Sequence, residues 1–130
     1  MSGGWIYRHG GNEYWLVYTA DAYFEIRERY GTDLFDGLRA DDRSGFDIAV
    51  GCLAILAREG ELCRRYMGYD ALPMLTEEEI RRTVLPDGIV SVKNAVMNAV
   101  LSGMRIENAR QKDEPIDVGL LEYEKKTEVG

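Results

Sequence analysis

A run of apolar residues near the middle of the chain constrains its fold most. Residues 45–58 read GFDIAVGCLAILAR, and apolar side chains would fall on nearly every side of a helix formed by them. Such a helix is stable only when other elements surround it, so we expect it to form the centre of the core. The most apolar part, residues 48–57, is too short to cross a bilayer. The N-terminal residues MSGGWIYRHGGNEYW also lack the long apolar stretch of a signal peptide.

The N-terminal segment predicts a β-hairpin. Residues 5–18, WIYRHGGNEYWLVY, form two aromatic-rich alternating runs on either side of Gly-Gly-Asn at 10–12. Gly and Asn tolerate the positive φ angles of tight turns, which makes this a strong hairpin signal. We expect Tyr14, Leu16 and Tyr18 to share one face. A lone hairpin is only marginally stable in water, so it must pack on helices or pair with another chain.

After the hairpin, the apolar spacing changes from two residues to about 3.6, which predicts helices. Thr19 is a suitable N-cap for a helix over residues 20–30, and Gly31 is a natural stop. A short helical turn capped by Thr32 is expected over residues 32–38.

Three further helices are expected in the second half of the chain. A break at Gly60 would separate the central helix from another helix that reaches residue 70. The Thr-x-x-Glu capping box at 76–79 starts a helix that should end near Leu85, because Pro86 disfavours helical geometry at the residue before it. Proline is welcome in a first helical turn, so a last helix can start at once. Its apolar stripe consists of Val92, Val96, Ala99, Val100 and Gly103.

Together these patterns predict a mainly α fold of the α+β class, with an N-terminal β-hairpin followed by a small bundle of about five helices. Residues 1–104 would form this domain. Residues 105–130 are acidic, contain a proline and lose the periodicity, which predicts a flexible C-terminal tail. The tail holds one short apolar cluster that could dock on a partner. Its side chains are Val118, Leu120, Leu121 and Tyr123.

The net charge of −7 over 130 residues restricts the partners. An acidic surface repels phosphate backbones and anionic lipids, so neither nucleic acid nor a membrane is an expected partner. The two cysteines, Cys52 and Cys63, lie among apolar residues and are expected to be buried thiols. A disulfide between them is the alternative and would need an oxidising compartment. We expect a reduced protein of the cytoplasm.

No catalytic residues emerge from the sequence. His9 is the only histidine, and it lies beside the hairpin turn with no nearby metal ligand, so it is expected at the surface. A pair of His9 with one of the cysteines is the alternative. Acidic clusters such as Asp41-Asp42 have better explanations as a solvated loop or as helix caps. No P-loop, dinucleotide fingerprint or calcium loop is present, so neither an enzyme nor a metal or other cofactor is expected.

Aromatic and apolar side chains of the hairpin and the last helix are the candidate partner-binding residues, because aromatic anchors dominate interface energetics. The alternative is that all five of the residues named next belong to the core. These residues are Trp5, Tyr7, Trp15, Val96 and Val100.

The order of the motifs resembles a known family. The stretch GGNEYWLVYTADAYFEIRERYG combines a glycine turn, an E-Y-x-L-type strand and a Thr-Ala-led helix that ends in E-x-x-x-x-G-like fashion. It is followed by FDIAVGCLAILAREGELCRRYMGYD and LTEEEIRRTVLPDGIVSVKNAVMNAVLSGM. This succession, over about residues 5–104, is similar to the tail assembly chaperones of long-tailed, siphovirus-type phages and prophages.

The resemblance implies a function without catalysis. Such chaperones act in the host bacterial cytoplasm, where they bind the long, largely helical tape measure protein and keep it soluble until tail tube subunits polymerise around it. Self-association and contact with the tail tube protein are further implications. A structural connector or tail completion subunit that stays in the particle is the alternative, and a small hydrolase that uses carboxylates ranks third.

The C-terminus generates a prediction about the gene, because many members of this family are made in a short form and a frameshifted longer form. Glu124-Lys125-Lys126 can be encoded as GAA AAA AAG, which contains a slippery A AAA AAG heptamer. We expect a shift of one base backwards there, which would replace residues 127–130 and append a second domain through the tail as a linker. The nucleotide sequence checks this. Another codon choice, or a stop within a few codons of the overlapping frame, would exclude it.

Overall fold

The computed structural model describes residues 4–113, with side chains described up to residue 104. Within this range the chain forms one two-stranded antiparallel sheet and five α-helices. The prediction of a mainly α fold with an N-terminal hairpin is therefore confirmed. The elements are β1 (Gly4–His9), β2 (Asn12–Val17), α1 (Ala20–Tyr30), α2 (Leu34–Arg39), α3 (Arg43–Tyr66), α4 (Glu77–Thr83), the 3-10 turn η1 (Pro86–Gly88) and α5 (Ile89–Asp113).

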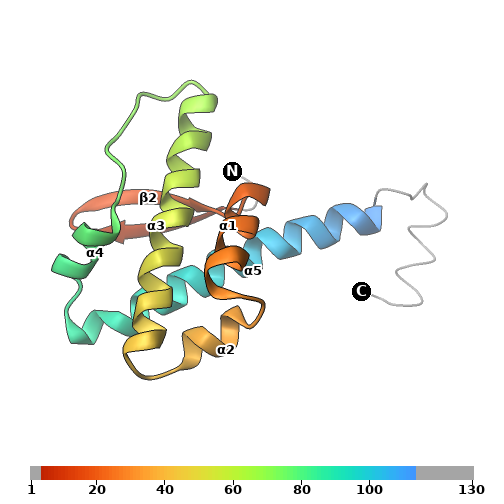
Figure 1. Cartoon of the computed structure of the whole chain (residues 1–130). Helices are drawn as coiled ribbons and strands as arrows, with labels where there is room; N and C mark the ends of the chain where they lie inside the picture. Colours follow the sequence, from red (N-terminus) through yellow and green to blue (C-terminus); the bar gives the residue numbers. More distant parts are fainter. Residues whose placement is uncertain (1–3, 114–130) are drawn as a thin grey trace.

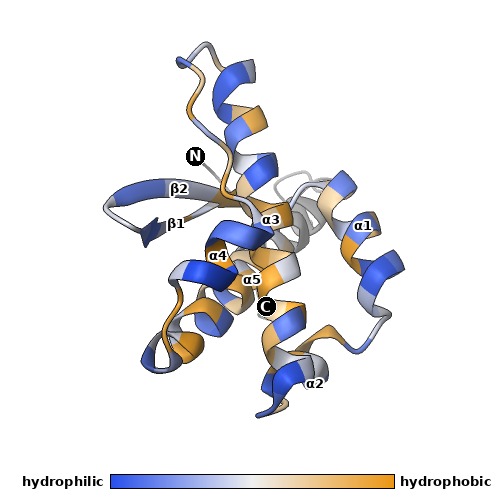
Figure 2. Cartoon of the chain, turned by 60° about the vertical axis from the view of Figure 1, so that its left-hand side comes forward, coloured by the Kyte–Doolittle hydropathy of each residue, from blue (hydrophilic) through white to orange (hydrophobic). Residues whose placement is uncertain are grey.

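The long helix α3 runs through the middle of the molecule (Figure 1). The hairpin crosses it on one side, α5 runs across it on another, and α1 and α2 pack along it. The C-terminal end of α3 and the loop that leads to α4 extend beyond the other elements (Figures 1 and 2). The centre of the molecule is thus helical, and the hairpin is a cover on it.

The hairpin has the expected turn and the expected faces. Gly10 and Gly11 adopt φ angles of 59° and 83°, which glycine reaches without strain. Leu16 is completely buried, and Tyr14 and Tyr18 pack beside it against the core. The two strands pair without a bulge from Gly4↔Val17 to His9↔Asn12. Burial of one face on the helices stabilises a sheet too small to fold alone.

Helix α1 is held to α3 at its N-terminus. The Thr19 hydroxyl accepts a hydrogen bond from the Ala22 N–H at 3.0 Å, as expected for an N-cap, and donates one to Glu59 of α3 at 2.8 Å. Arg58 of α3 donates to Glu25 of α1 at 2.7 Å and also to Glu59 at 2.9 Å. The hydrogen bond from Arg58 keeps the pKa of Glu25 below its usual value. A threonine, an arginine and two carboxylates therefore fasten the two helices together.

Helix α2 begins later than expected. It covers Leu34–Arg39, and Asp33 rather than Thr32 takes the N-cap position, without a side-chain hydrogen bond to the helix. Leu38 is buried, so packing on α3 rather than capping stabilises this short helix.

The expected break at Gly60 is wrong, because α3 is one continuous helix from Arg43 to Tyr66. Gly60 lies inside it and faces the backbone of β2: a Cβ atom at this position would lie 1.8 Å from the Trp15 carbonyl oxygen. The glycine thus permits close packing of a strand on a helix. Helix α3 starts with the Asp42 side chain accepting from the Gly45 N–H at 3.1 Å.

The corner at Pro86 agrees with the sequence in outline. The Thr76 hydroxyl accepts from the Glu79 N–H at 3.1 Å, and α4 ends at Thr83, slightly before the expected Leu85. Leu85 is extended, and Pro86 opens the turn η1. Helix α5 then continues to Asp113, beyond residue 104, where the periodicity had suggested the end of the helical domain. Residues 114–130 lie outside the described part of the chain.

Two glycine-to-alanine variants test how closely α3 is packed. Alanine favours a helix by about 1 kcal/mol over glycine. We expect Gly60→Ala nevertheless to lower the free energy of unfolding by about 1–3 kcal/mol, because the new methyl group meets the Trp15 backbone. Gly51→Ala in the same helix is the control, since its Cβ would meet the end of the Tyr30 side chain, 1.7 Å from the hydroxyl, and that ring can move. Urea unfolding measures both, and a Gly60→Ala protein as stable as Gly51→Ala would contradict the packing argument.

Candidate partner-binding surface

Large exposed apolar side chains gather at the end of α3 and in the loop that follows it. We call residues 62–72 the α3 arm. The exposed fractions of its large apolar and aromatic side chains run from 43% for Leu62 to 93% for Tyr66. Leu62 and Tyr66 are four residues apart and lie on one face of the helix. The other members are Met67, Tyr69 and Leu72.

Exposed apolar side chains that lie together mark interaction sites, whereas singly exposed ones are common. In Figure 2 the projecting end of α3 is mostly hydrophilic with one hydrophobic part, and further hydrophobic residues lie along parts of the loop. The arm is therefore the candidate surface for a protein partner.

A buried carboxylate holds the loop of the arm in place. Glu61 is only 6% exposed, and its carboxylate accepts hydrogen bonds from Arg64 at 2.8 Å and Arg65 at 2.9 Å. It also accepts the backbone N–H of Leu72 at 2.7 Å. The same two arginines donate to loop carbonyls, Arg64 to Asp70 and Arg65 to Leu72. The loop is thus fixed to the last turns of α3, and its apolar side chains are presented in a defined arrangement.

A cluster of two aromatic rings and an arginine supports the base of the arm. The rings of Trp15 and Tyr69 meet edge to face, with their centroids 5.7 Å apart. The guanidinium of Arg64 lies 5.8 Å from the Trp15 ring centroid and 5.3 Å from that of Tyr69. Such contacts each contribute about 0.5–1 kcal/mol when partly exposed. Arg64 therefore joins the hairpin, α3 and the loop.

The environment of Glu61 also changes its proton affinity. Burial alone would raise the pKa of its carboxyl group, but the hydrogen bonds from the Leu72 N–H, Arg65 and Arg64 outweigh this and keep the pKa below the usual value. The ionised form is thus the one that the fold requires. This carboxylate is structural, because each of its hydrogen bonds goes to the arm itself.

A hollow lies where the loop passes the hairpin. The first three residues of β2 line one side of this hollow. Two residues of the loop and one residue of α4 line the other side. The lining residues are Asn12, Glu13, Tyr14, Leu72, Pro73 and Glu79. Leu72 belongs to both the arm and this hollow, so the hollow adjoins the arm.

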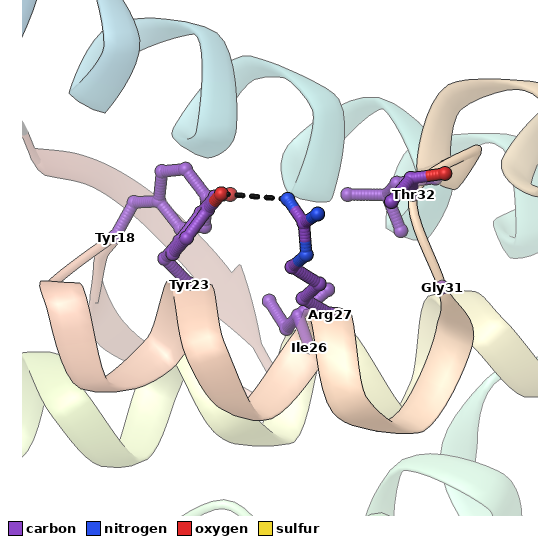
Figure 3. A pocket seen from close by; sticks show the side chains of 7 residues that line it. Tyr18, Tyr23, Ile26, Arg27, Gly31 and Thr32 are labelled. Carbon is purple, nitrogen blue, oxygen red and sulfur yellow. Dashed lines mark hydrogen bonds between the residues drawn. The ribbon is translucent and has the colours of Figure 1, made fainter.

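A second hollow lies beside α1 (Figure 3). Two of its polar side chains are engaged with each other, since Arg27 donates to the Tyr23 hydroxyl at 2.9 Å. Tyr18, Ile26 and Leu34 provide apolar lining. We assign this hollow no function.

The candidate residues predicted from the sequence fall into different places. Val96 and Val100 are 0% and 1% exposed, so the expectation that they are exposed is wrong: they belong to the stripe of α5 that faces the core. Trp15 is half-buried beneath the arm, and Tyr7 packs against the core. Trp5 remains available, with 39% of its surface exposed. The proposed docking residues Leu120, Leu121 and Tyr123 lie outside the described residues.

None of the candidate residues predicted from the sequence lies in the arm, because the break expected at Gly60 hides the continuous helix that carries it. The missed signal was the segment CRRYMGYDAL, in which aromatic and apolar side chains surround two arginines. Gly68, with a φ of 97°, ends the helix just after Tyr66. A helix that continues through Gly60 brings Tyr66 out of the core.

The two cysteines and the single histidine, the residue types best suited to catalysis, have roles in packing or in contacts between elements. Cys52 is buried, and burial raises the pKa of its thiol to about 12; burial also raises the pKa of Cys63. Both cysteines are free thiols, and neither environment favours a reactive thiolate. His9 contacts the Tyr7 hydroxyl through Nδ1 at 3.3 Å and the Thr83 hydroxyl through Nε2, so it joins β1 to α4.

Among the side chains described, up to residue 104, no group of three or more His, Cys, Asp and Glu is placed to hold a metal ion. None of the helices described between residues 4 and 113 is long and apolar enough to cross a membrane. No protein-family model matches the chain, and neither a curated protein nor a solved structure matches it. The resemblance to tail assembly chaperones therefore stays a prediction.

Replacing Glu61 by glutamine tests its role in the arm. We expect Glu61→Gln to lower the free energy of unfolding by about 1–3 kcal/mol, because two arginines lose a charged acceptor. Hydrogen exchange at the Leu72 amide should accelerate as the loop is released. Glu78→Gln is the control, because its ion pair with Arg82 is 3.6 Å long and both side chains are largely exposed. A Leu72 amide that stays equally protected in Glu61→Gln would contradict this role.

The free energy of unfolding of the natural protein should depend on pH differently from that of Glu61→Gln. The pKa of Glu61 is lower in the folded chain than its reference value of 4.5, so the unfolded chain binds the proton more readily. The stabilisation that ionised Glu61 contributes is complete at a pH above that reference value. It is lost as the pH falls through the lower pKa of Glu61 in the folded state. Acid should therefore destabilise the natural protein more steeply than Glu61→Gln, as measured by unfolding between neutral pH and the acid limit.

Proposed function

We propose that this protein is a tail assembly chaperone of a long-tailed phage or prophage that binds the tape measure protein in the host bacterial cytoplasm and keeps it soluble. The exposed apolar α3 arm is the observation that carries the proposal. A long helical protein exposes apolar stripes before it is enclosed, and a chaperone must cover them with apolar surface of its own. The motif order over residues 5–104 supports the same proposal.

The construction of the arm suits this role. A binding surface that is already ordered pays less conformational entropy on association than a flexible one. Glu61, Arg64 and Arg65 order the loop through hydrogen bonds that leave Tyr66 and Met67 exposed. Tyrosine and methionine are well suited to a long partner of varied sequence, because a phenol offers both apolar area and a hydrogen bond and a thioether adapts its shape.

The other parts of the proposal follow from the same role. The protein would act without catalysis, and its direct partner would be the tape measure protein. Contact with the tail tube protein and self-association would serve the handover of the tape measure to the growing tube. Several copies would be needed along one long ligand.

The proposal expects the gene of a very long tape measure protein beside this one, and co-expression with that protein tests the proposal. We expect the natural chain to increase the soluble fraction of the tape measure protein several-fold, and the double variant Tyr66→Ser, Met67→Ser to lose most of this effect. The control is Phe24→Ser, Val90→Ser, which removes exposed apolar side chains from α1 and α5 instead. Both variants should remain folded, since exposed positions contribute little to stability.

The outcome separates the proposal from its alternative. Equal solubility with the arm variant and the natural chain would remove the arm from the mechanism. A structural connector or completion subunit would remain in purified phage particles, whereas a chaperone would be missing from them. Detection of this chain in stoichiometric amounts in particles would therefore overturn the chaperone proposal.

A further inference from the structure

The geometry of the hairpin determines which backbone groups point away from it. The strands are joined by the two-residue turn Gly10-Gly11, both with positive φ, and the flanking His9 and Asn12 are paired. In this type of hairpin the flanking pair exchanges hydrogen bonds, and bonded and non-bonded pairs then alternate along the strands. The N–H and C=O groups that point outward therefore belong to alternate residues of each strand. They are those of Gly4, Ile6 and Arg8 on β1 and of Glu13, Trp15 and Val17 on β2.

The outer edge of β2 is closed by α3. The outward carbonyl of Trp15 lies so close to Gly60 that a Cβ atom there would be 1.8 Å from the oxygen. The Arg64 guanidinium, one turn further along α3, covers the Trp15 ring. No additional strand can be added on this side of the sheet.

The outer edge of β1 is different. Among the described residues, the backbone groups of Ile6 and Arg8 that point outward make no hydrogen bond. The surroundings are accessible: Ile6 is 47% exposed, Trp5 is 39% exposed, and the Arg8 side chain is 79% exposed. Natural edge strands usually avoid pairing by means of proline, a bulge or several charges. β1 pairs evenly along its length, contains no proline, and carries one full charge, on Arg8.

A second copy of β1 complements this edge. If a two-fold axis passes beside Ile6, this residue lies opposite its own copy, and Gly4 lies opposite Arg8 at either end. Every outward N–H and C=O then finds a partner, which gives roughly six backbone hydrogen bonds. The two Arg8 side chains lie at opposite ends of the pair, so they do not repel each other. On one face, Trp5 lies opposite Tyr7 of the other copy, an arrangement that favours aromatic cross-strand contact.

We propose that two copies of this protein associate through their β1 edges in antiparallel fashion, which joins the two hairpins into one four-stranded sheet with a two-fold axis beside Ile6. This dimer gives the self-association of the proposed function a definite geometry, but it rests on the β1 edge and not on the chaperone role. The α3 arm is separate from the β1 edge, because α3 lies on the β2 side of the hairpin. The dimer would thus carry two arms, and two linked sites bind one long ligand far more tightly than single sites do.

Charge variants at Ile6 test the two-fold register on the purified full-length chain. Sedimentation should show the natural protein as a dimer. Ile6→Lys and Ile6→Glu should each weaken the dimer by about tenfold or more, because like charges would face each other directly across the axis. An equimolar mixture of the two variants should restore a dimer, since the new lysine then faces the new glutamate. Circular dichroism confirms that each variant is folded.

Phe24→Lys, on the exposed surface of α1, is the control for added charge and should leave the dimer unchanged. A natural protein that sediments as a monomer at its highest soluble concentration would overturn the proposal. A dimer that persists in both Ile6 variants, or a mixture that stays monomeric, would also overturn it. If the protein is a monomer and its Ile6 amide is nevertheless protected from hydrogen exchange, other residues of the same chain pair with the β1 edge. None of these outcomes bears on whether the arm solubilises a tape measure protein.

Discussion

The close approach of the β2 backbone to Gly60 organises much of this molecule. A glycine in the middle of a long helix costs stability, yet here it lets a strand lie against the helix at a distance that no other residue would permit. The contact closes one edge of the hairpin and leaves the other accessible. It also places Trp15 beneath Arg64 and Tyr69, where the ring supports the projecting arm. A binding surface and a pairing edge both follow from one contact.

Two buried glutamates of α3 each hold a different neighbouring element in place. Glu59 connects the helix to Thr19 and, through Arg58, to the side of α1. Glu61, two residues later, holds the loop beyond the helix with Arg64 and Arg65. Buried carboxylates are costly to desolvate, and these are tolerated because each is matched by donors. Such pairs contribute defined geometry more than net stability, and defined geometry is what a surface for partner recognition requires.

Local sequence signals at helix ends agree with the structure, whereas signals that depend on packing do not. Thr19, Gly31 and Thr76 acted at helix ends as their local chemistry predicts, because a cap needs only its own neighbours in the chain. Gly60 was misinterpreted, since the same residue type ends one helix and permits close packing in another. Val96 and Val100 were misplaced for a related reason: an apolar stripe faces either the core or a partner, and spacing alone does not distinguish the two.

The sequence by itself determined the class of fold, the hairpin turn, the capped helix starts and the apolar stripe of α5, because these depend on interactions between residues near each other in the chain. The tertiary structure alone decided that α3 continues through Gly60, that Tyr66 and Met67 are exposed, and that β1 rather than β2 keeps an accessible edge. These features depend on contacts between Trp15 and Gly60 and between Arg64 and Tyr69. The first of these pairs is far apart in sequence, and the second requires the loop to fold back on its helix. Local propensity does not contain such contacts, since burial and close packing are properties of the assembled chain.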